Sequence, residues 1–296
     1  MNSRWVTPSE MAAHRACRHK WAYAWALELQ PPDKPGGAAA VGTAVHACIA
    51  AFLSGEASDP LEPLRDAQGA RGVREDDERI AAYVRTWAAH AAADSEIYRQ
   101  AQGVAVEKRV RWPCCPESPA GSPETVLGVE GTADAIVRLP RSLAIVDHKT
   151  TWMPAQQWQR RWGLSTEMQL RLYDLCVCAN TGDSDSPVKL AADVIGTTGV
   201  TRLSWVADAR SRRATATVAS VQLMLIQADL DDLLGDRIDL NGNLASAMMS
   251  PSAACEWCSY RNVCALRMRG AGRPHDEAAA ALARVPRLAY REKAGI

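Results

Sequence analysis

Four cysteines that lie far apart in the sequence place the strongest constraint on how this chain can fold. Cys17 is near the N-terminus, whereas Cys255, Cys258 and Cys264 lie close together toward the other end of the 296 residues. A Cys-x2-Cys-x5-Cys segment with one remote cysteine suits either zinc or an iron–sulfur cluster, and the spacing does not decide between them. If the four thiols share one centre, the two parts of the chain must meet, and we expect that centre to be structural rather than catalytic.

The other cysteines are expected to be buried or incidental. The first residues lack the apolar segment of a signal peptide, and no stretch is apolar for long enough to span a bilayer, so we expect a cytoplasmic protein without a membrane partner. Thiols stay reduced in that compartment, which argues against disulfides among the nine cysteines. Cys48, Cys176 and Cys178 lie in apolar segments and are predicted to pack in the core.

Composition does not by itself reveal a binding partner. Hydrophobic residues make up 47% of the chain and the formal net charge is zero, so contact with a nucleic acid would need a local basic patch. The segment from Trp152 to Trp162 is one candidate, because its tryptophans and its two adjacent arginines suit bases and phosphates. The same pattern fits equally well an amphipathic helix whose tryptophans pack on the core.

Periodicity and turn signals predict the following elements. Helices are expected over residues 8–29, 42–53, 76–98, 154–179 and 222–234. Strands are expected over residues 103–112, 126–139, 142–147, 189–200, 202–206 and 215–218, and residues 54–74 are expected to form a polar, poorly ordered connection. A single domain is predicted over 1–270, with a mainly helical part (1–100), a core (101–205), a C-terminal part that holds the cysteines (206–270) and then a tail (271–296).

Two aspartates and a lysine form a candidate site for a hard metal ion. Asp134 follows Gly-Thr-Ala on one predicted strand, and Asp147 and Lys149 lie two residues apart on the next. Residues i and i+2 of a strand face the same side, and a hairpin would bring Asp134 close to them. Carboxylate and carbonyl oxygens suit Mg²⁺ or Mn²⁺, and a neighbouring lysine can position water or offset developing charge.

An Asp-x-Lys triplet alone is common and usually marks a solvated ion pair. The run Leu143–Val146 before Asp147 is apolar, however, as expected for a buried strand that ends at a site. Glu107, on an earlier strand, is a further acidic neighbour of the site, although an outward-facing strand residue is the simpler interpretation.

Four short motifs occur in an order typical of one nuclease family. They are Gly42-Thr-Ala-Val-His46, Gly131-Thr-Ala-Asp134, Asp147-His-Lys149 and Gln169-Leu-Arg-Leu-Tyr173. The series resembles the RecB-like branch of the PD-(D/E)XK nuclease superfamily. The resemblance implies that a metal ion is bound by His46, Asp134, Asp147 and the main-chain carbonyl of His148. It also implies that Lys149 is catalytic, and that Gln169 and Tyr173 orient the site and contact DNA.

The same resemblance bears on the cysteines. AddB-type and CRISPR-associated RecB-like nucleases hold a [4Fe–4S] cluster with one N-terminal and three C-terminal cysteines. Ser9 to Cys17, followed by aromatic residues, is similar to their N-terminal segment, and the C-terminal spacing also matches. The resemblance therefore implies that Cys17, Cys255, Cys258 and Cys264 hold such a cluster, with zinc as the alternative.

The sequence thus predicts an α/β fold, in which helices flank a central mixed β-sheet with a restriction-endonuclease-like core and the cluster joins helical N- and C-terminal segments. The expected function is a Mg²⁺- or Mn²⁺-dependent DNA exonuclease that acts on single-stranded or frayed DNA in recombination, repair, or phage or CRISPR DNA processing. No Gly-x-x-x-x-Gly-Lys-Ser/Thr motif is present, so we expect either a stand-alone nuclease or a subunit that works with a separate helicase, recombination or adaptation protein. The alternative is a catalytically silent DNA-binding or scaffold subunit of such a complex.

Overall fold

The computed structural model describes residues 2–26, 38–72, 74–114, 124–234, 258 and 260. The chain divides into two compact units. One contains Met1–Pro35, Pro113–Val129 and Ala219–Ile296, and the other contains Gly36–Trp112 and Glu130–Val218. The predicted cluster residues Cys255 and Cys264, and the predicted tail 271–296, lie outside the described residues.

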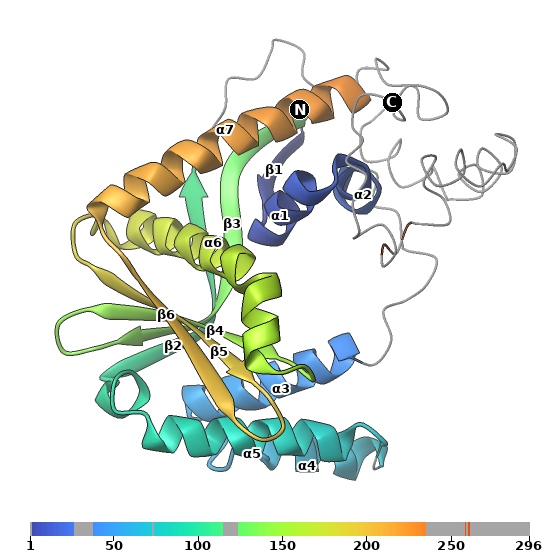
Figure 1. Ribbon diagram of the computed structural model, residues 1–296, viewed down its shortest axis with the longest axis vertical. Coiled ribbons are helices and arrows are strands. Elements are labelled where there is room, and N and C mark those ends of the chain that lie inside the picture. Colours follow the sequence, from blue (N-terminus) through green and yellow to red (C-terminus); the bar gives the residue numbers. More distant parts are fainter. Residues whose placement is uncertain are drawn as a thin grey trace, which may run out of the picture. The chain divides into compact units, whose positions relative to one another are not determined.

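A mixed β-sheet forms the centre of the second unit, and Figure 1 shows its strands with helices on both sides. Its strands are β2 (Gly103–Pro113), β3 (Glu124–Arg138), β4 (Leu143–Thr150), β5 (Val188–Ile195) and β6 (Val200–Ala207). β2 and β4 both pair with β3, β4 is parallel to β5, and β5 is antiparallel to β6. The parallel pair is joined by the long helix α6 (Ala155–Thr181), since parallel neighbours need a crossover. The predicted α/β fold with a mixed sheet is confirmed.

Helices cover the two faces of this sheet. α6 contacts β4, β5 and β6, while α5 (Asp77–Ala93) contacts β5 and β6. Successive strand residues point to opposite faces. Accordingly Val146 and Ala191 pack with Ile97, just after α5, whereas the charge of Asp147 acts on Tyr173 of α6. The polar residues at the end of β4 therefore point alternately to the α6 side and to the α5 side of the sheet.

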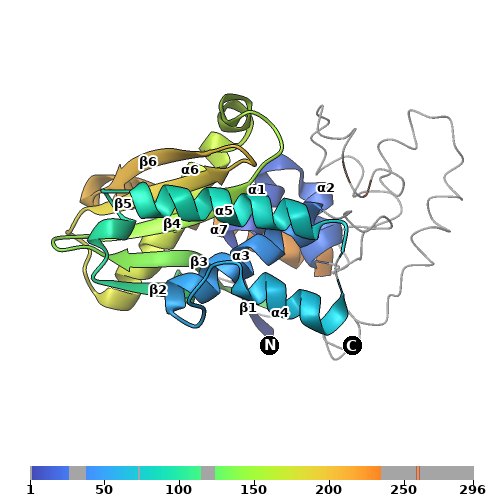
Figure 2. The same cartoon turned by 90° about the horizontal axis from the view of Figure 1, so that it is seen from below.

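Three helices pack together on the α5 side of the sheet, as Figure 2 shows. α3 (Ala38–Ser54) contacts both α5 and α4 (Glu62–Arg71), with Val45, Val84 and Trp87 fully buried. The expectation of a poorly ordered connection over 54–74 is wrong, because α4 lies within it. This helix has few apolar residues, and its place depends on one buried side chain, Leu64, in the shared core.

The long helix α7 (Ala209–Leu234) corrects a second expectation. Residues 215–218, predicted as a strand, lie inside it. Asp208 and Ser211 form reciprocal side-chain to backbone hydrogen bonds of 2.7 and 2.9 Å at its start, which is the geometry of a capping box. Arg212 and Thr215 are buried at a spacing of three residues, as one face of a helix requires. The β-branched residues of this segment are therefore helical, because the cap and the burial pattern outweigh their strand propensity.

The first unit begins with β1 (Asn2–Val6), which pairs in parallel with Glu124–Val129 of β3. The predicted helix over 8–29 is interrupted, giving α1 (Pro8–Ala16), α2 (Arg18–Trp21) and a π-helical turn, η1 (Ala22–Ala26). Thr7 caps α1 by accepting a hydrogen bond from the Glu10 amide at 3.1 Å. The break falls at Cys17, whose backbone is extended (φ −165°, ψ 109°). Its sulfur accepts a hydrogen bond from the Lys20 amide at 3.5 Å.

The C-terminal part of α7 packs on α1 within this unit. His14 lies 2.8 Å from Asp229, and Gln222 donates a hydrogen bond to the Met11 carbonyl. Asp229 also pairs with Arg18 of α2, so one buried carboxylate ties α1 and α2 to α7. Among the described helices, none has the length and apolar character needed to cross a membrane.

Candidate active site

Two aspartates meet where β3 and β4 separate. The antiparallel ladder pairs Ala135–Arg138 with Leu143–Val146. Asp134 and Asp147 lie one step beyond the last pair, on the same face of the sheet. The carboxylate of Asp134 accepts a hydrogen bond from the main-chain amide of His148 at 2.7 Å, which fixes it beside the end of β4.

Lys149 lies on the same face of β4 as Asp147, as the strand period predicts. Its ammonium donates to Asp147 Oδ1 at 2.9 Å. Asp147 is only 1% exposed, and its Oδ2 has no hydrogen-bond partner, although the ammonium lies 2.9 Å away outside hydrogen-bond geometry. The ion pair with Lys149 offsets part of the cost of burying this charge, but Oδ2 still accepts no well-directed hydrogen bond. A hard divalent cation would satisfy it, so this observation fits a Mg²⁺ or Mn²⁺ site.

The two carboxylates have opposite pKa shifts. Burial raises the pKa of Asp147 to about 6, against the attraction of Lys149 and with added repulsion from Asp134. Burial also acts to raise the pKa of Asp134, but contact with the His46 ring and the His148 amide holds it below its usual range. The pKa of Lys149 is raised, since its carboxylate neighbours outweigh its burial. At neutral pH the site therefore holds an ammonium between two carboxylates.

His46 and Glu107 approach Asp134 from two other elements. One ligand atom from each of the three residues lies within 4.8 Å of the others, and the His46 Nδ1 is 3.5 Å from Asp134 Oδ2. Glu107 has a φ of 46°, in a left-handed region that a non-glycine residue enters at a cost. Sequence reasoning favoured an outward-facing Glu107. Glu107 is exposed, as that interpretation expects, and it also lies beside His46 and Asp134.

The close approach of α3 to β4 explains the glycine in the His46 motif. A side-chain carbon added at Gly42 would lie 3.3 Å from Thr150 Oγ1, closer than most real contacts. Glycine thus allows α3 to lie against the end of β4 one turn before His46. A larger residue would move the helix that carries the imidazole.

Gln169 and Tyr173 lie one turn apart on α6, where their side chains meet. The Gln169 amide donates to the Tyr173 hydroxyl at 2.8 Å. Tyr173 is 6% exposed, and burial together with the charges of Asp147 and Asp134 raises its pKa. The structure therefore brings both residues of the predicted motif to the face that carries Asp147.

The side chain of His148 points to the opposite face of β4 from Asp147, although its Nδ1 lies 3.8 Å from Asp134 Oδ2 and its ring centre lies 6.0 Å from that of His46. Burial lowers its pKa to about 4, so the ring is neutral at neutral pH. Its Nε2 lies 3.0 Å from the Tyr98 hydroxyl, which in turn donates to Asp193 at 2.9 Å. Arg202 completes this cluster with two hydrogen bonds to Asp193 and one to Asp94. Sequence reasoning missed the whole cluster, because its members come from β4, β5, β6 and the segment that follows α5, and they carry no local motif.

Two of the four predicted cluster cysteines can be placed. Cys17 and Cys258 are free and partly exposed. The Tyr260 ring packs 5.5 Å from Tyr23 of η1, so Tyr260 lies beside the helical turn that follows Cys17 and α2. Cys48 and Cys176 are buried as expected, and Cys178 is partly buried.

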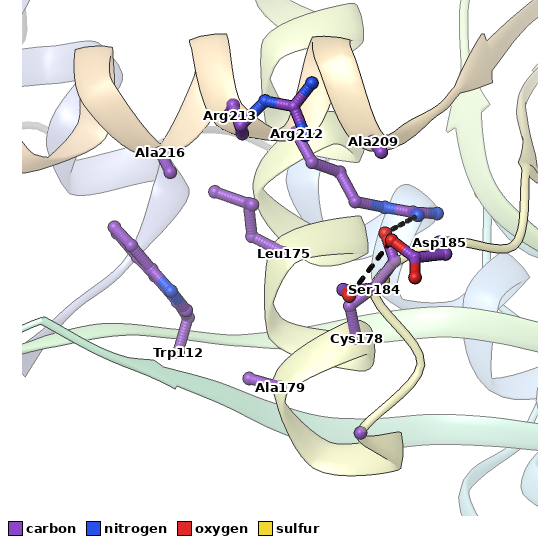
Figure 3. A pocket seen from close by; sticks show the side chains of 11 residues that line it. Trp112, Leu175, Cys178, Ala179, Ser184, Asp185, Ala209, Arg212, Arg213 and Ala216 are labelled. Carbon is purple, nitrogen blue, oxygen red and sulfur yellow. Dashed lines mark hydrogen bonds between the residues drawn. The ribbon is translucent and has the colours of Figure 1, made fainter.

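A separate open pocket of about 470 Å³ lies between α6 and the start of α7. Figure 3 shows Trp112 and Leu175 on its apolar side and Arg212 beside Ser184. Arg212 is already bonded to Asp174 and to the carbonyls of Ser184 and Ser186. A buried arginine that is satisfied in this way stabilises the packing of α7 rather than marking a reactive centre.

Comparison with known proteins identifies the family of this chain. No curated protein matches the chain. One solved structure, described as a putative exonuclease from Eubacterium rectale, shares 11% identity with a TM-score of 0.48, covering 86% of this chain and 92% of its own. Another, SSO0001, shares 13% identity with a TM-score of 0.33, covering 77% of this chain and 85% of its own. The sequence profile of one family matches residues 6–265. The chain therefore belongs to the PD-(D/E)XK nuclease superfamily.

Proposed function

We propose that this chain is a deoxyribonuclease that requires Mg²⁺ or Mn²⁺ and degrades single-stranded or frayed DNA from its ends. The observation that supports it most directly is the buried Oδ2 of Asp147, which lacks a hydrogen-bond partner beside Asp134 and Lys149. Within a nuclease superfamily, such a set of oxygens suits a divalent cation. The exonuclease assignment and the RecB-like branch rest on the resemblance of the four motifs.

Each site residue has a proposed role. Asp134, Asp147, His46 and the His148 carbonyl would hold the cation, and Glu107 is added to this set because it lies beside His46 and Asp134. The cation, when bound, polarises a phosphate and lowers the pKa of a water ligand. Lys149, held by Asp147, places a positive charge where the attacking water and the developing negative charge would lie. Tyr173 and Gln169 hold each other in place on α6, facing the site.

The test is degradation of end-labelled DNA with Mn²⁺ by the wild type, Lys149→Ala and Lys189→Ala. Lys189 is the matched control, because it lies at the other end of the neighbouring strand, opposite Ala144. We expect Lys149→Ala to lose at least about 100-fold in rate and Lys189→Ala to stay within about twofold of the wild type. EDTA should abolish cleavage. Circular single strands, which have no ends, should survive if the enzyme is an exonuclease.

A silent DNA-binding or scaffold subunit is the rival function. Equal cleavage by the wild type and Lys149→Ala, or no cleavage by either, would overturn the catalytic assignment and favour the rival. The intact set of Asp134, Asp147 and Lys149 argues against it, because a binding subunit has no need of a buried, unsatisfied carboxylate. A recombination, repair, phage or CRISPR setting, with a separate helicase or adaptation protein, is proposed from the resemblance.

We also propose a structural [4Fe–4S] cluster held by Cys17, Cys255, Cys258 and Cys264. The free thiols of Cys17 and Cys258, and the packing of Tyr260 on Tyr23, support it. Anaerobic purification followed by visible absorption and metal analysis tests the proposal. A colourless protein with one zinc ion and no iron would replace the cluster with a zinc site.

A further inference from the structure

Exposed aromatic residues lie immediately after the strand that carries Lys149. Trp152 is 85% exposed, although tryptophan side chains in folded proteins are usually largely covered. It follows Lys149 by three residues. Consecutive Cα atoms are about 3.8 Å apart, so the Trp152 Cα lies within about 11 Å of the Lys149 Cα. An exposed indole therefore lies at the margin of the candidate active site.

Basic and aromatic groups continue along the start of α6. Trp162 is 44% exposed, and the Arg161 guanidinium lies 5.2 Å from the centre of its ring. Arg160 lines an open depression together with Gln156 and Gln159. Residues 152–166 include no aspartate or glutamate, although the whole chain has as many acidic as basic residues. We call the exposed segment that carries Trp152, Arg160, Arg161 and Trp162 the Trp152–Trp162 surface.

Packing of α6 does not account for this exposure. Trp158, within the same segment, is 7% exposed and anchors the start of the helix in the core. The amphipathic-helix interpretation is thus correct for Trp158, but it leaves Trp152 and Trp162 outside the core. Tryptophan and arginine are enriched in binding surfaces, and two exposed tryptophans and two exposed arginines occur between residues 152 and 162. Among the described residues, no ion pair joins Arg160 or Arg161 to a carboxylate, so both guanidinium groups can bind an anion.

We propose that the Trp152–Trp162 surface binds single-stranded DNA and leads it into the active site. Unpaired bases expose their flat faces and can stack on Trp152 and Trp162, while phosphates contact Arg160 and Arg161. Bases inside a duplex are already stacked on one another, so the indoles favour single strands over paired ends. The inference rests on the proposed nuclease function, because DNA is taken as the substrate.

Binding can be measured apart from cleavage by working in EDTA. Fluorescence anisotropy with a labelled oligo-dT strand and with a blunt-ended duplex would compare the wild type with Trp152→Ala/Trp162→Ala. Loss of base stacking costs about 1–3 kcal/mol per base, so we expect at least about a tenfold loss of single-strand affinity in the double variant. Duplex affinity should change by less than about twofold.

The arginines are tested by the salt dependence of single-strand binding. Replacing Arg160 or Arg161 with alanine should make the slope of log K against log salt less steep by about 0.7 for each phosphate that the variant no longer neutralises. Arg79→Ala is the matched control, because Arg79 is an exposed helical arginine on α5. It should leave both the slope and the affinity unchanged.

The outcomes separate this proposal from the nuclease function. A double tryptophan variant that melts like the wild type and keeps its single-strand affinity would overturn the proposal, and so would an equal loss for single strands and duplex. Unchanged DNA binding with an altered oligomeric state would assign the surface to a protein contact and would also overturn it. Selective loss of single-strand binding supports the proposal, even if the wild type shows no cleavage with Mn²⁺, and in that case only the nuclease function fails.

Discussion

Two buried aspartates on neighbouring strands differ in how fully the protein satisfies their carboxylates. Asp147 on β4 is 1% exposed, and Asp193 on β5 is 0% exposed. In the parallel register Asp193 lies opposite His148, the residue after Asp147, so the two carboxylates point to opposite faces of the sheet. They differ in what surrounds them rather than in how deeply they are buried.

The surroundings of Asp193 satisfy it completely. Arg202 donates to both of its oxygens at 2.7 and 2.8 Å, and Tyr98 donates at 2.9 Å. Burial would raise the pKa of Asp193, but its contacts with His90 and Arg202 hold it well below the usual range. Asp147 has one hydrogen bond, from Lys149, and burial raises its pKa to about 6. A buried carboxylate that the protein satisfies stabilises the fold, whereas one left partly unsatisfied is available to a ligand.

Replacing Asp147 should have the largest effect on activity. A cation site supplies several kcal/mol of transition-state stabilisation, so Asp147→Asn should lower the Mn²⁺-dependent rate by at least about 1000-fold. Its unfolding free energy in EDTA should fall by less than that of Asp193→Asn, because burial disfavours the charged form of Asp147, whereas the partners of Asp193 favour its charged form. DNA degradation assays and urea unfolding measure the two effects. An Asp147→Asn variant that cleaves DNA but is less stable than the wild type would mean that Asp147, like Asp193, stabilises the fold and does not hold a cation.

Replacing Asp193 should have the opposite consequence. Breaking a buried ion pair by removing one partner costs about 3–5 kcal/mol, so Asp193→Asn should lower the unfolding free energy by that amount. Asp66→Asn, the same change at an exposed site on α4, should stay within about 0.5 kcal/mol of the wild type. Urea unfolding in EDTA is the measurement. If Asp193→Asn unfolds like the Asp66 control, the distinction between the two carboxylates fails.

The two carboxylates should also respond oppositely to pH. The folded pKa of Asp147, about 6, lies above its ordinary 3.8, so folding favours the protonated form. In EDTA the wild type should therefore lose stability relative to Asp147→Asn as pH rises from about 4 to 7. The folded pKa of Asp193 is depressed, so its stabilising effect is present above pH 3.8 and is lost as pH falls below that value. If the difference in unfolding free energy between the wild type and Asp147→Asn did not change between pH 4 and 7, the raised pKa of Asp147 would be contradicted.

The sequence predicted the parts of this comparison that depend on local pattern. Strand alternation and a hairpin place Asp134, Asp147 and Lys149 on one face, and a helical spacing of four aligns Gln169 with Tyr173. These depend on short-range geometry, so one sequence suffices to place them. Their roles in catalysis remain predictions.

The satisfied cluster could not be predicted in the same way. Asp193, Arg202 and Tyr98 meet only because β5 pairs with β6 and a short 3-10 turn follows α5. Glu107, which has a positive φ in β2, lies beside Asp134 and His46. The sequence pattern also mispredicts parts of α4 and α7. One buried leucine in α4 and a capping box at the start of α7 outweigh the local composition. Long-range pairing, rather than residue type, brings the members of the satisfied cluster together.

Tyr98 contacts Asp193 and the residue that follows Asp147. Removing its hydroxyl should have the smallest of the expected effects. It contacts His148, whose main-chain amide holds Asp134, and it donates to Asp193. Tyr98→Phe leaves one acceptor without its donor, so we expect a loss of about 1–2 kcal/mol in unfolding free energy. The effect on cleavage should be less than about tenfold, because the amide of His148 is also fixed by β4. Tyr83→Phe, which loses a buried hydroxyl bonded to the Thr151 carbonyl, is the control for a structural loss alone. A rate that falls 100-fold in Tyr98→Phe but not in Tyr83→Phe would show that the satisfied cluster positions the metal ligands, and the two carboxylates would then form one functional unit.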